Sequence, residues 1–237
     1  MPTFISPDKN IFSPQEADFS EVARYLGYRK TVFPDGQVQE LIKKACDQLL
    51  TVIKPQGTFE IFDLTVTMPQ GQEDGQDLGG GQVPGQLQDQ KPEIKFSDVS
   101  FKSLDLARNL KNCNKVYLMA ATIGPQVDAL IRRANVCDPT YAAVLQATGA
   151  MYIEKFVDYI NDLIKKEVAS AGGKVGGKVG CKTRPRYSPG FGDVPLDLQK
   201  VFFRLLPCTR IGLSLMDTLI MAPEKSVTAF IGVMEDR

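Results

Sequence analysis

Apolar residues recur at helical spacing in several stretches of the chain. The clearest stripe follows Asp35, a residue type that caps helices, and ends at Pro55. The longest stripe runs over 139–170, after Asp138, and contains Gly149. Because glycine costs a helix about 1 kcal/mol relative to alanine, Gly149 indicates a close backbone contact. The same spacing predicts further helices over 15–30, 103–110, 125–134 and 194–206, the last with Asp193 and Pro195 as its cap and first turn.

Other stretches have the composition and alternation of strands. Segment 58–68 is rich in β-branched and aromatic residues, and 95–101 is predicted to be its continuation or partner. Segment 115–123 is a continuous apolar run that is long enough for a buried strand. From Thr209 onward the pattern predicts two or three strands. They include an alternation at Ile211, Leu213 and Leu215, and a turn at 222–225.

The mixed order of these elements predicts an α+β fold, with a twisted antiparallel sheet and helices packed on it. We expect an N-terminal arm over 1–14 and a single domain over 15–237. Segment 69–92 consists almost wholly of Gly, Gln, Asp and Pro, which predicts a flexible hairpin insertion. Segment 172–180 reads GGKVGGKVG and contains GxxxxGK, but Val179 stands where a phosphate-binding loop needs Ser or Thr. We interpret it as a mobile linker.

Composition and charge exclude several classes of function. The chain has 237 residues, of which 43% are hydrophobic, so it is long enough for one large core. Its 28 basic residues offset 28 acidic ones, so nucleic acid and anionic membrane are not expected partners. The chain shows neither a signal-peptide pattern nor 18 consecutive apolar residues, and we therefore expect a cytoplasmic protein.

The chain contains no histidine. This excludes a Ser/His/Asp triad, an HExxH zinc site and a histidine general base. Five cysteines are widely separated without a CxxC pair, which predicts buried or inert thiols rather than a metal or redox centre. We therefore expect neither a catalytic acid–base residue nor a bound metal.

The stretch RYSPGF, from Arg186 to Phe191, is the strongest candidate for a ligand loop. The arginine offers a fork for a carboxylate, Gly190 allows close approach of the backbone, and Phe191 offers a ring for stacking. The N-terminal amides of the following helix would point toward the same place. These are the groups that would recognise the amino-acid end and the adenine of S-adenosylmethionine. A tight turn without a ligand is the alternative.

RYSPGF, the helix after it and the closing MAPEKSVTAFIGV resemble the activation domain of cobalamin-dependent methionine synthase, whose hallmark is an Arg-x-x-x-Gly-Tyr loop. YLGYRK (25–30) and KVYLMAATIGPQVDALIRR (115–133) are similar to free-standing, shorter relatives of that domain. The resemblance spans most of 21–233, apart from the two low-complexity segments. It implies the same α+β fold and a role in methionine biosynthesis.

The resemblance also implies a site and a ligand. In that family the domain binds S-adenosylmethionine and faces the corrinoid, so that cob(II)alamin is remethylated after one-electron reduction. By resemblance, Arg186 would hold the carboxylate of the ligand, and the backbone around Ser188 and Gly190 would lie against it. Phe191 would replace the family tyrosine, which keeps the ring and loses the hydroxyl.

The expected partners follow from what the sequence lacks. Without a histidine the chain cannot supply the usual lower cobalt ligand, so a separate corrinoid-binding methionine synthase or related methyltransferase would carry the cobalamin. Without a cysteine cluster or a flavin signature, the electron would come from an external flavodoxin-like or ferredoxin-like donor. The expected function is a reactivation subunit for such a protein. The alternatives are a non-catalytic docking module that does not bind S-adenosylmethionine, and an unrelated domain.

Overall fold

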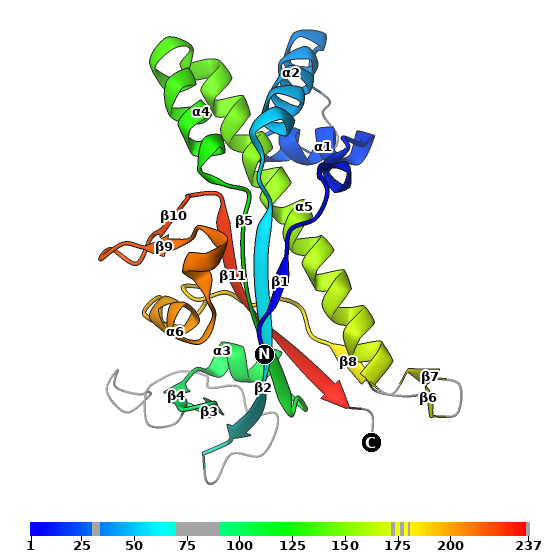
Figure 1. Cartoon of the computed structure of the whole chain (residues 1–237), viewed down its shortest axis with the longest axis vertical. Coiled ribbons are helices and arrows are strands. Elements are labelled where there is room, and N and C mark those ends of the chain that lie inside the picture. Colours follow the sequence, from blue (N-terminus) through cyan, green and yellow to red (C-terminus); the bar gives the residue numbers. More distant parts are fainter. Residues whose placement is uncertain (30–33, 70–90, 172–173, 176–177, 180, 236–237) are drawn as a thin grey trace.

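An antiparallel sheet of seven strands forms the centre of the molecule (Figure 1). The computed structural model describes residues 1–29, 34–69, 91–171, 174–175, 178–179 and 181–235. The strands follow the order β4-β3-β2-β5-β11-β8, and β1 pairs with the N-terminal part of β2. Their bounds are β1 (Thr3–Ile5), β2 (Gln56–Thr67), β3 (Glu93–Phe96), β4 (Val99–Lys102), β5 (Lys115–Thr122), β8 (Cys181–Thr183) and β11 (Ser226–Glu235).

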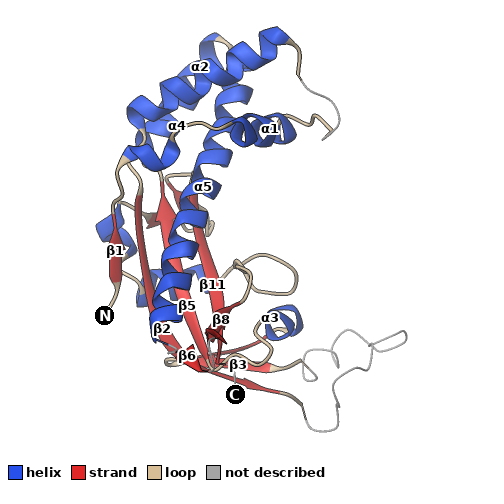
Figure 2. Ribbon diagram, turned by 90° about the vertical axis from the view of Figure 1, so that its right-hand side faces the viewer, coloured by secondary structure: helices blue, strands red, loops and turns tan. Residues whose placement is uncertain are grey.

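Helices cover both faces of this sheet. They are η1 (Lys9–Phe12), α1 (Glu16–Tyr25), α2 (Gly36–Val52), α3 (Leu104–Asn109), α4 (Pro125–Cys137), α5 (Pro139–Ala171), α6 (Leu198–Leu205) and η2 (Cys208–Ile211). Figure 2 shows α5 running along the strands, with α1, α2 and α4 gathered around its N-terminal half. Across the described ranges, no helix is both long and apolar enough to cross a membrane. The predicted α+β class is confirmed.

The alternation of side chains along β5 explains its continuous apolar sequence. Tyr117 and Met119 face a core shared with α1, α2, α4 and α5. Leu118 and Ala120 point the other way, into a second core shared with α3, α6 and η2. Because successive strand residues face opposite sides of a sheet, a strand covered on both faces needs apolar residues at every position.

Two of the helix starts predicted from the sequence are confirmed by their capping hydrogen bonds. Asp35 accepts from the Val38 N–H at 2.9 Å, and Asp138 accepts from the Tyr141 N–H at 3.0 Å. Gly124 precedes α4 with φ +95°, a value that residues with a Cβ rarely adopt. The boundaries of these helices therefore follow from local chemistry.

Gly149 marks a close contact, as the sequence predicts. The side chain of Lys225 lies across it, and a Cβ built on Gly149 would stand 3.1 Å from Lys225 Cε. Lys225 Nζ donates a hydrogen bond to Gln146 Oε1, one turn earlier on α5. The glycine thus allows the start of β11 to pack against the long helix.

Three of the predicted segments fold differently. Segment 95–101 is confirmed as a partner of 58–68, since β3 pairs antiparallel with β2, but it forms two strands, because Ser97 adopts φ +50° in a turn that joins β3 to β4. The helix predicted over 194–206 begins only at Leu198, after a series of turns. The alternation at Ile211, Leu213 and Leu215 is not one strand, since Ile211 ends the 3-10 helix η2 and only β9 (Ser214–Leu215) pairs, with β10 (Met221–Ala222).

Asp193 caps a helix other than the one predicted. Its carboxylate accepts hydrogen bonds from the Ser103 hydroxyl and from the Leu104 and Asp105 N–H groups, at the N-terminus of α3. Lys91 Nζ lies 3.1 Å from the same carboxylate. Sequence spacing could not reveal this, because the capped helix lies about 90 residues earlier in the chain.

The two low-complexity segments lie largely outside the described residues. Of the predicted insertion 69–92, only 69, 91 and 92 are described. Of the predicted linker 172–180, the described residues form the short strands β6 (Lys174–Val175) and β7 (Lys178–Val179), which pair antiparallel. The repeated Lys-Val dipeptides supply these paired positions.

Phe230 joins β11 to the second core, and its truncation should destabilise the protein. The side chain is fully buried, with its ring centroid 4.8 Å from that of Phe202 and 5.8 Å from that of Phe96. We expect Phe230→Ala to lower the free energy of unfolding by about 3–5 kcal/mol in urea titration. Val136→Ala, at a side chain that is 85% exposed, is the control and should change it by less than about 0.5 kcal/mol. Equal effects would contradict this assignment of the core.

The cap formed by Asp193 should make stability depend on pH. Burial opposes its ionisation, but the hydrogen bonds from Ser103, Leu104 and Lys91 lower the pKa of Asp193 to about 2. The pKa of an aspartate in the unfolded chain is about 3.9. The stabilisation by the ionised carboxylate is therefore complete above about pH 3.9 and is lost as the pH falls toward about 2.

We therefore expect Asp193→Asn to lower the free energy of unfolding by about 1–2 kcal/mol at neutral pH. This is less than the pKa shift alone would give, because the side chain is partly exposed to solvent. The difference from the wild type should shrink as the pH falls from about 5 to about 2. Urea titrations across this range measure it, with Asp217→Asn in the exposed β9–β10 turn as the control. A pH-independent difference would show that the cap acts without its charge.

Candidate functional site

The loop that contains RYSPGF is anchored to the sheet by one backbone pair. Tyr187 and Phe230 form an antiparallel bridge, in which the Tyr187 N–H donates to Phe230 O at 3.0 Å and the Phe230 N–H donates to Tyr187 O at 2.8 Å. Residues opposite each other in such a bridge point to the same face, and Tyr187 packs with Phe230 in the second core. The neighbouring Arg186 therefore points to the face covered by α5.

Arg186 is held by two carboxylates of α5. Its Nη2 lies 3.0 Å from Glu154 Oε2, and its Nη1 contacts Asp158 Oδ1. Glu154 and Asp158 are four residues apart and so project from the same side of the helix. The Arg186 side chain is 24% exposed, Glu154 is 44% exposed and Asp158 is 66% exposed. The predicted carboxylate-binding arginine thus already has carboxylate partners within the chain.

Tyr25, the last residue of α1, lies near this ion-pair cluster. Partial burial and the negative charge of Glu154 raise the pKa of Tyr25, so its hydroxyl stays protonated at neutral pH. The guanidinium of Arg24 lies 4.4 Å from the centre of the Tyr25 ring. The site therefore combines an aromatic ring, a guanidinium and two carboxylates from three parts of the chain.

After Tyr187 the loop makes a compact turn that exposes its aromatic residue. The Phe191 N–H donates to Ser188 O at 3.3 Å, and the Gly190 N–H donates to Val194 O at 3.0 Å. Gly190 has φ +87°, which a residue with a side chain rarely adopts. The Phe191 side chain is 68% exposed, so its ring is free to contact a ligand or a partner.

The helix after the loop contributes less than the sequence predicts. It begins at Leu198, and its N-cap Asp197 makes no side-chain capping hydrogen bond. Residues 194–197 separate the predicted cap, Asp193, from this first turn. Its N-terminal amides therefore do not follow directly on the RYSPGF loop.

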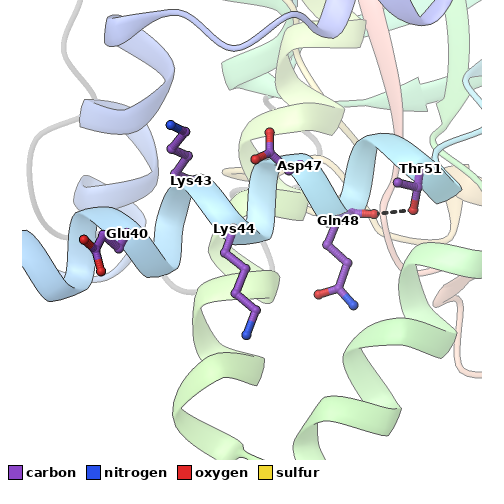
Figure 3. A pocket seen from close by; sticks show the side chains of 6 residues that line it. All are labelled: Glu40, Lys43, Lys44, Asp47, Gln48 and Thr51. Atoms are coloured by element: carbon purple, nitrogen blue, oxygen red, sulfur yellow. Dashed lines mark hydrogen bonds between the residues drawn. The ribbon is translucent and has the colours of Figure 1, made fainter.

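A hollow of about 550 Å³ lies elsewhere, on α2. It is lined by Glu40, Lys43, Lys44, Asp47, Gln48 and Thr51, all of which belong to that one helix (Figure 3). The Tyr141 hydroxyl donates to Gln48 Oε1 at 2.8 Å, and Lys44 Nζ lies 4.7 Å from the centre of the Tyr141 ring. Since all the lining residues belong to one helix and no residue of the RYSPGF loop is among them, the hollow is a groove beside α2 rather than a built site.

The cysteines only partly follow the expectation of buried, inert thiols. Burial raises the pKa of Cys46 to about 11 and that of Cys208 to about 12, so both thiols remain protonated at neutral pH. Cys137 is exposed, because it ends α4 beside the exposed Val136. Among the residues that the structure describes, no three His, Cys, Asp or Glu side chains gather as a metal site.

The sequence predicts the loop as a candidate site but not the side chains that contact it. Ser188, Gly190 and Phe191 lie in one turn, whereas Arg186 precedes this turn and its side chain contacts α5. The carboxylates of Glu154 and Asp158 were missed, although their spacing of four on a predicted helix was a visible signal. Their pairing with Arg186 spans about 30 residues and depends on how β8 packs against α5.

Comparison with known proteins supports the fold. No protein-family model matches the chain, and no curated protein matches it in sequence. Among solved structures it is similar to the MetH reactivation domain, whose crystal structure was determined bound to AdoHcy. The TM-score is 0.64, the sequences are 13% identical, and the match covers 100% of this chain and 79% of that chain. At this identity the likeness establishes a shared fold, the α+β fold of the MetH reactivation domain.

Proposed function

We propose that the chain binds S-adenosylmethionine and serves as a reactivation subunit for a separate corrinoid protein. The observation that carries the proposal is the position of Arg186, at the start of an anchored loop in a chain with the fold of the MetH reactivation domain. The neighbour was solved with AdoHcy, the demethylated form of this ligand. The proposal extends that ligand class to this chain.

The loop offers a separate group for each part of the ligand. The guanidinium of Arg186 would pair with the methionyl carboxylate. The backbone of Ser188 and Gly190 would lie close to the ligand on the side of Gly190 away from Leu196, whose Cδ1 lies 3.1 Å from where a Cβ would stand. The exposed ring of Phe191 would stack on the adenine. Together these contacts would fix the ligand at both ends.

The role of the chain would be positioning rather than acid–base catalysis. Bound S-adenosylmethionine would supply a methyl group on a sulfonium, and the nucleophile would be cob(I)alamin on the partner, formed by one-electron reduction of cob(II)alamin. Transfer of the methyl group releases a neutral thioether and moves no proton, so a site without histidine is adequate. Arg186 and Phe191 would orient the ligand, and the loop would exclude water.

A docking module that does not bind S-adenosylmethionine is the second candidate. It is favoured by the two internal carboxylates on Arg186, which occupy the group that the ligand would need. It is also favoured by Phe191, which lacks the hydroxyl of the family tyrosine. In that case the exposed loop would contact a corrinoid methyltransferase directly.

Calorimetric titration with S-adenosylmethionine distinguishes these candidates. We expect saturable binding by the wild type and a loss of about ten-fold or more in affinity for Arg186→Ala, because a charged hydrogen-bonded pair is removed. Arg204→Ala is the matched control, since Arg204 is ion-paired with Asp98 outside the loop. It should bind like the wild type.

The outcome that contradicts the first proposal is a folded wild-type protein that binds no S-adenosylmethionine. Binding that Arg186→Ala leaves unchanged would place the ligand elsewhere. If the ligand binds as proposed, the wild type should support reductive remethylation of a corrinoid methionine synthase with an external electron donor, and Arg186→Ala should not.

A further inference from the structure

We propose that Asp158 is a specificity-determining residue, which competes with the carboxylate of the ligand for Arg186, while Glu154 holds the arginine in place. This inference rests on the proposed function. It assigns different roles to two carboxylates that contact the same guanidinium. The affinity of the site for a carboxylate would then be set by a residue that need not touch the ligand.

The division of contacts on Arg186 is the first argument. A guanidinium binds a carboxylate most strongly through two parallel N–H groups. Here Nη2 is directed to Glu154 and Nη1 to Asp158, so each carboxylate takes one of the two nitrogens. Each Nη carries two N–H groups, so a ligand carboxylate that binds both Nη nitrogens would share Nη1 with Asp158 and would be repelled by its like charge.

The surroundings of the two carboxylates indicate which one leaves. Asp158 is 66% exposed, whereas Glu154 is 44% exposed and lies near Tyr25. An exposed carboxylate recovers its hydration when it separates, so breaking its ion pair costs little. The Asp158 side chain can therefore rotate toward solvent, while Glu154 keeps its contact with Arg186 and holds the guanidinium beside α5.

The charge of the cluster is the third argument. One guanidinium faces two carboxylates, which leaves one negative charge over. This surplus repels an approaching carboxylate and attracts the ammonium and sulfonium groups of the same ligand. Removing the charge of Asp158 should therefore favour ligands that carry a carboxylate over ligands that lack it.

The test compares the affinities of S-adenosylmethionine and decarboxylated S-adenosylmethionine. We expect Asp158→Asn to bind S-adenosylmethionine about two- to five-fold more tightly than the wild type, as fits an exposed ion pair, and to bind the decarboxylated ligand no more tightly. Asp162→Asn is the matched control, because Asp162 lies on the same helix, is 63% exposed and pairs with Lys165. An affinity ratio that is the same in Asp158→Asn and in the wild type would overturn the proposal.

A measurement without S-adenosylmethionine separates this proposal from the proposed function. Phenylglyoxal modifies accessible guanidinium groups, and mass spectrometry quantifies its addition to Arg186. We expect modification to be several-fold faster in Asp158→Asn and unchanged in Asp162→Asn. If no variant binds S-adenosylmethionine, the proposed function fails, and the labelling alone decides whether Asp158 restrains Arg186. Equal rates in all three proteins would overturn that restraint.

Discussion

The backbone pair between Tyr187 and Phe230 determines where the RYSPGF loop lies and which way its side chains point. Phe230 is fully buried in the middle of β11, so the pair attaches the loop to an immobile part of the sheet. Strand alternation then separates two neighbouring side chains. Tyr187 joins the core beside α3 and α6, and Arg186 reaches α5 on the opposite face. A shift of one residue in this register would reverse both directions.

The long helix α5 supplies the rigid counterpart to this loop. Its inner face forms the first core with the sheet, and its Glu154 and Asp158 meet Arg186 from one side. Helical spacing fixes the backbone positions of both carboxylate residues relative to each other. The contacts to Arg186 can therefore change only by rotation of side chains. The site is therefore formed between two elements that are each held by a core, which is the kind of support that a positioning function requires.

Local signals in the sequence were enough to predict the class of fold and most helix starts. Caps such as Asp35 and Asp138 act within a few residues of the chain. The continuous apolar run of β5 indicates that this strand is buried on both faces. The errors arose where a residue acts at long range. Asp193 caps α3 rather than the helix after it, and the carboxylates of Arg186 lie on a helix about 30 residues earlier. Such pairings depend on the packed topology, which local spacing does not contain.

The central claim is that the loop from Arg186 to Phe191 is a ligand site. A crystal structure of the protein in complex with S-adenosylmethionine is its most direct test. The account predicts the ligand carboxylate on the Arg186 guanidinium, with Asp158 turned away and Glu154 still in contact, and the adenine against the Phe191 ring. A ligand bound elsewhere, with Arg186 still held by both carboxylates, would contradict it.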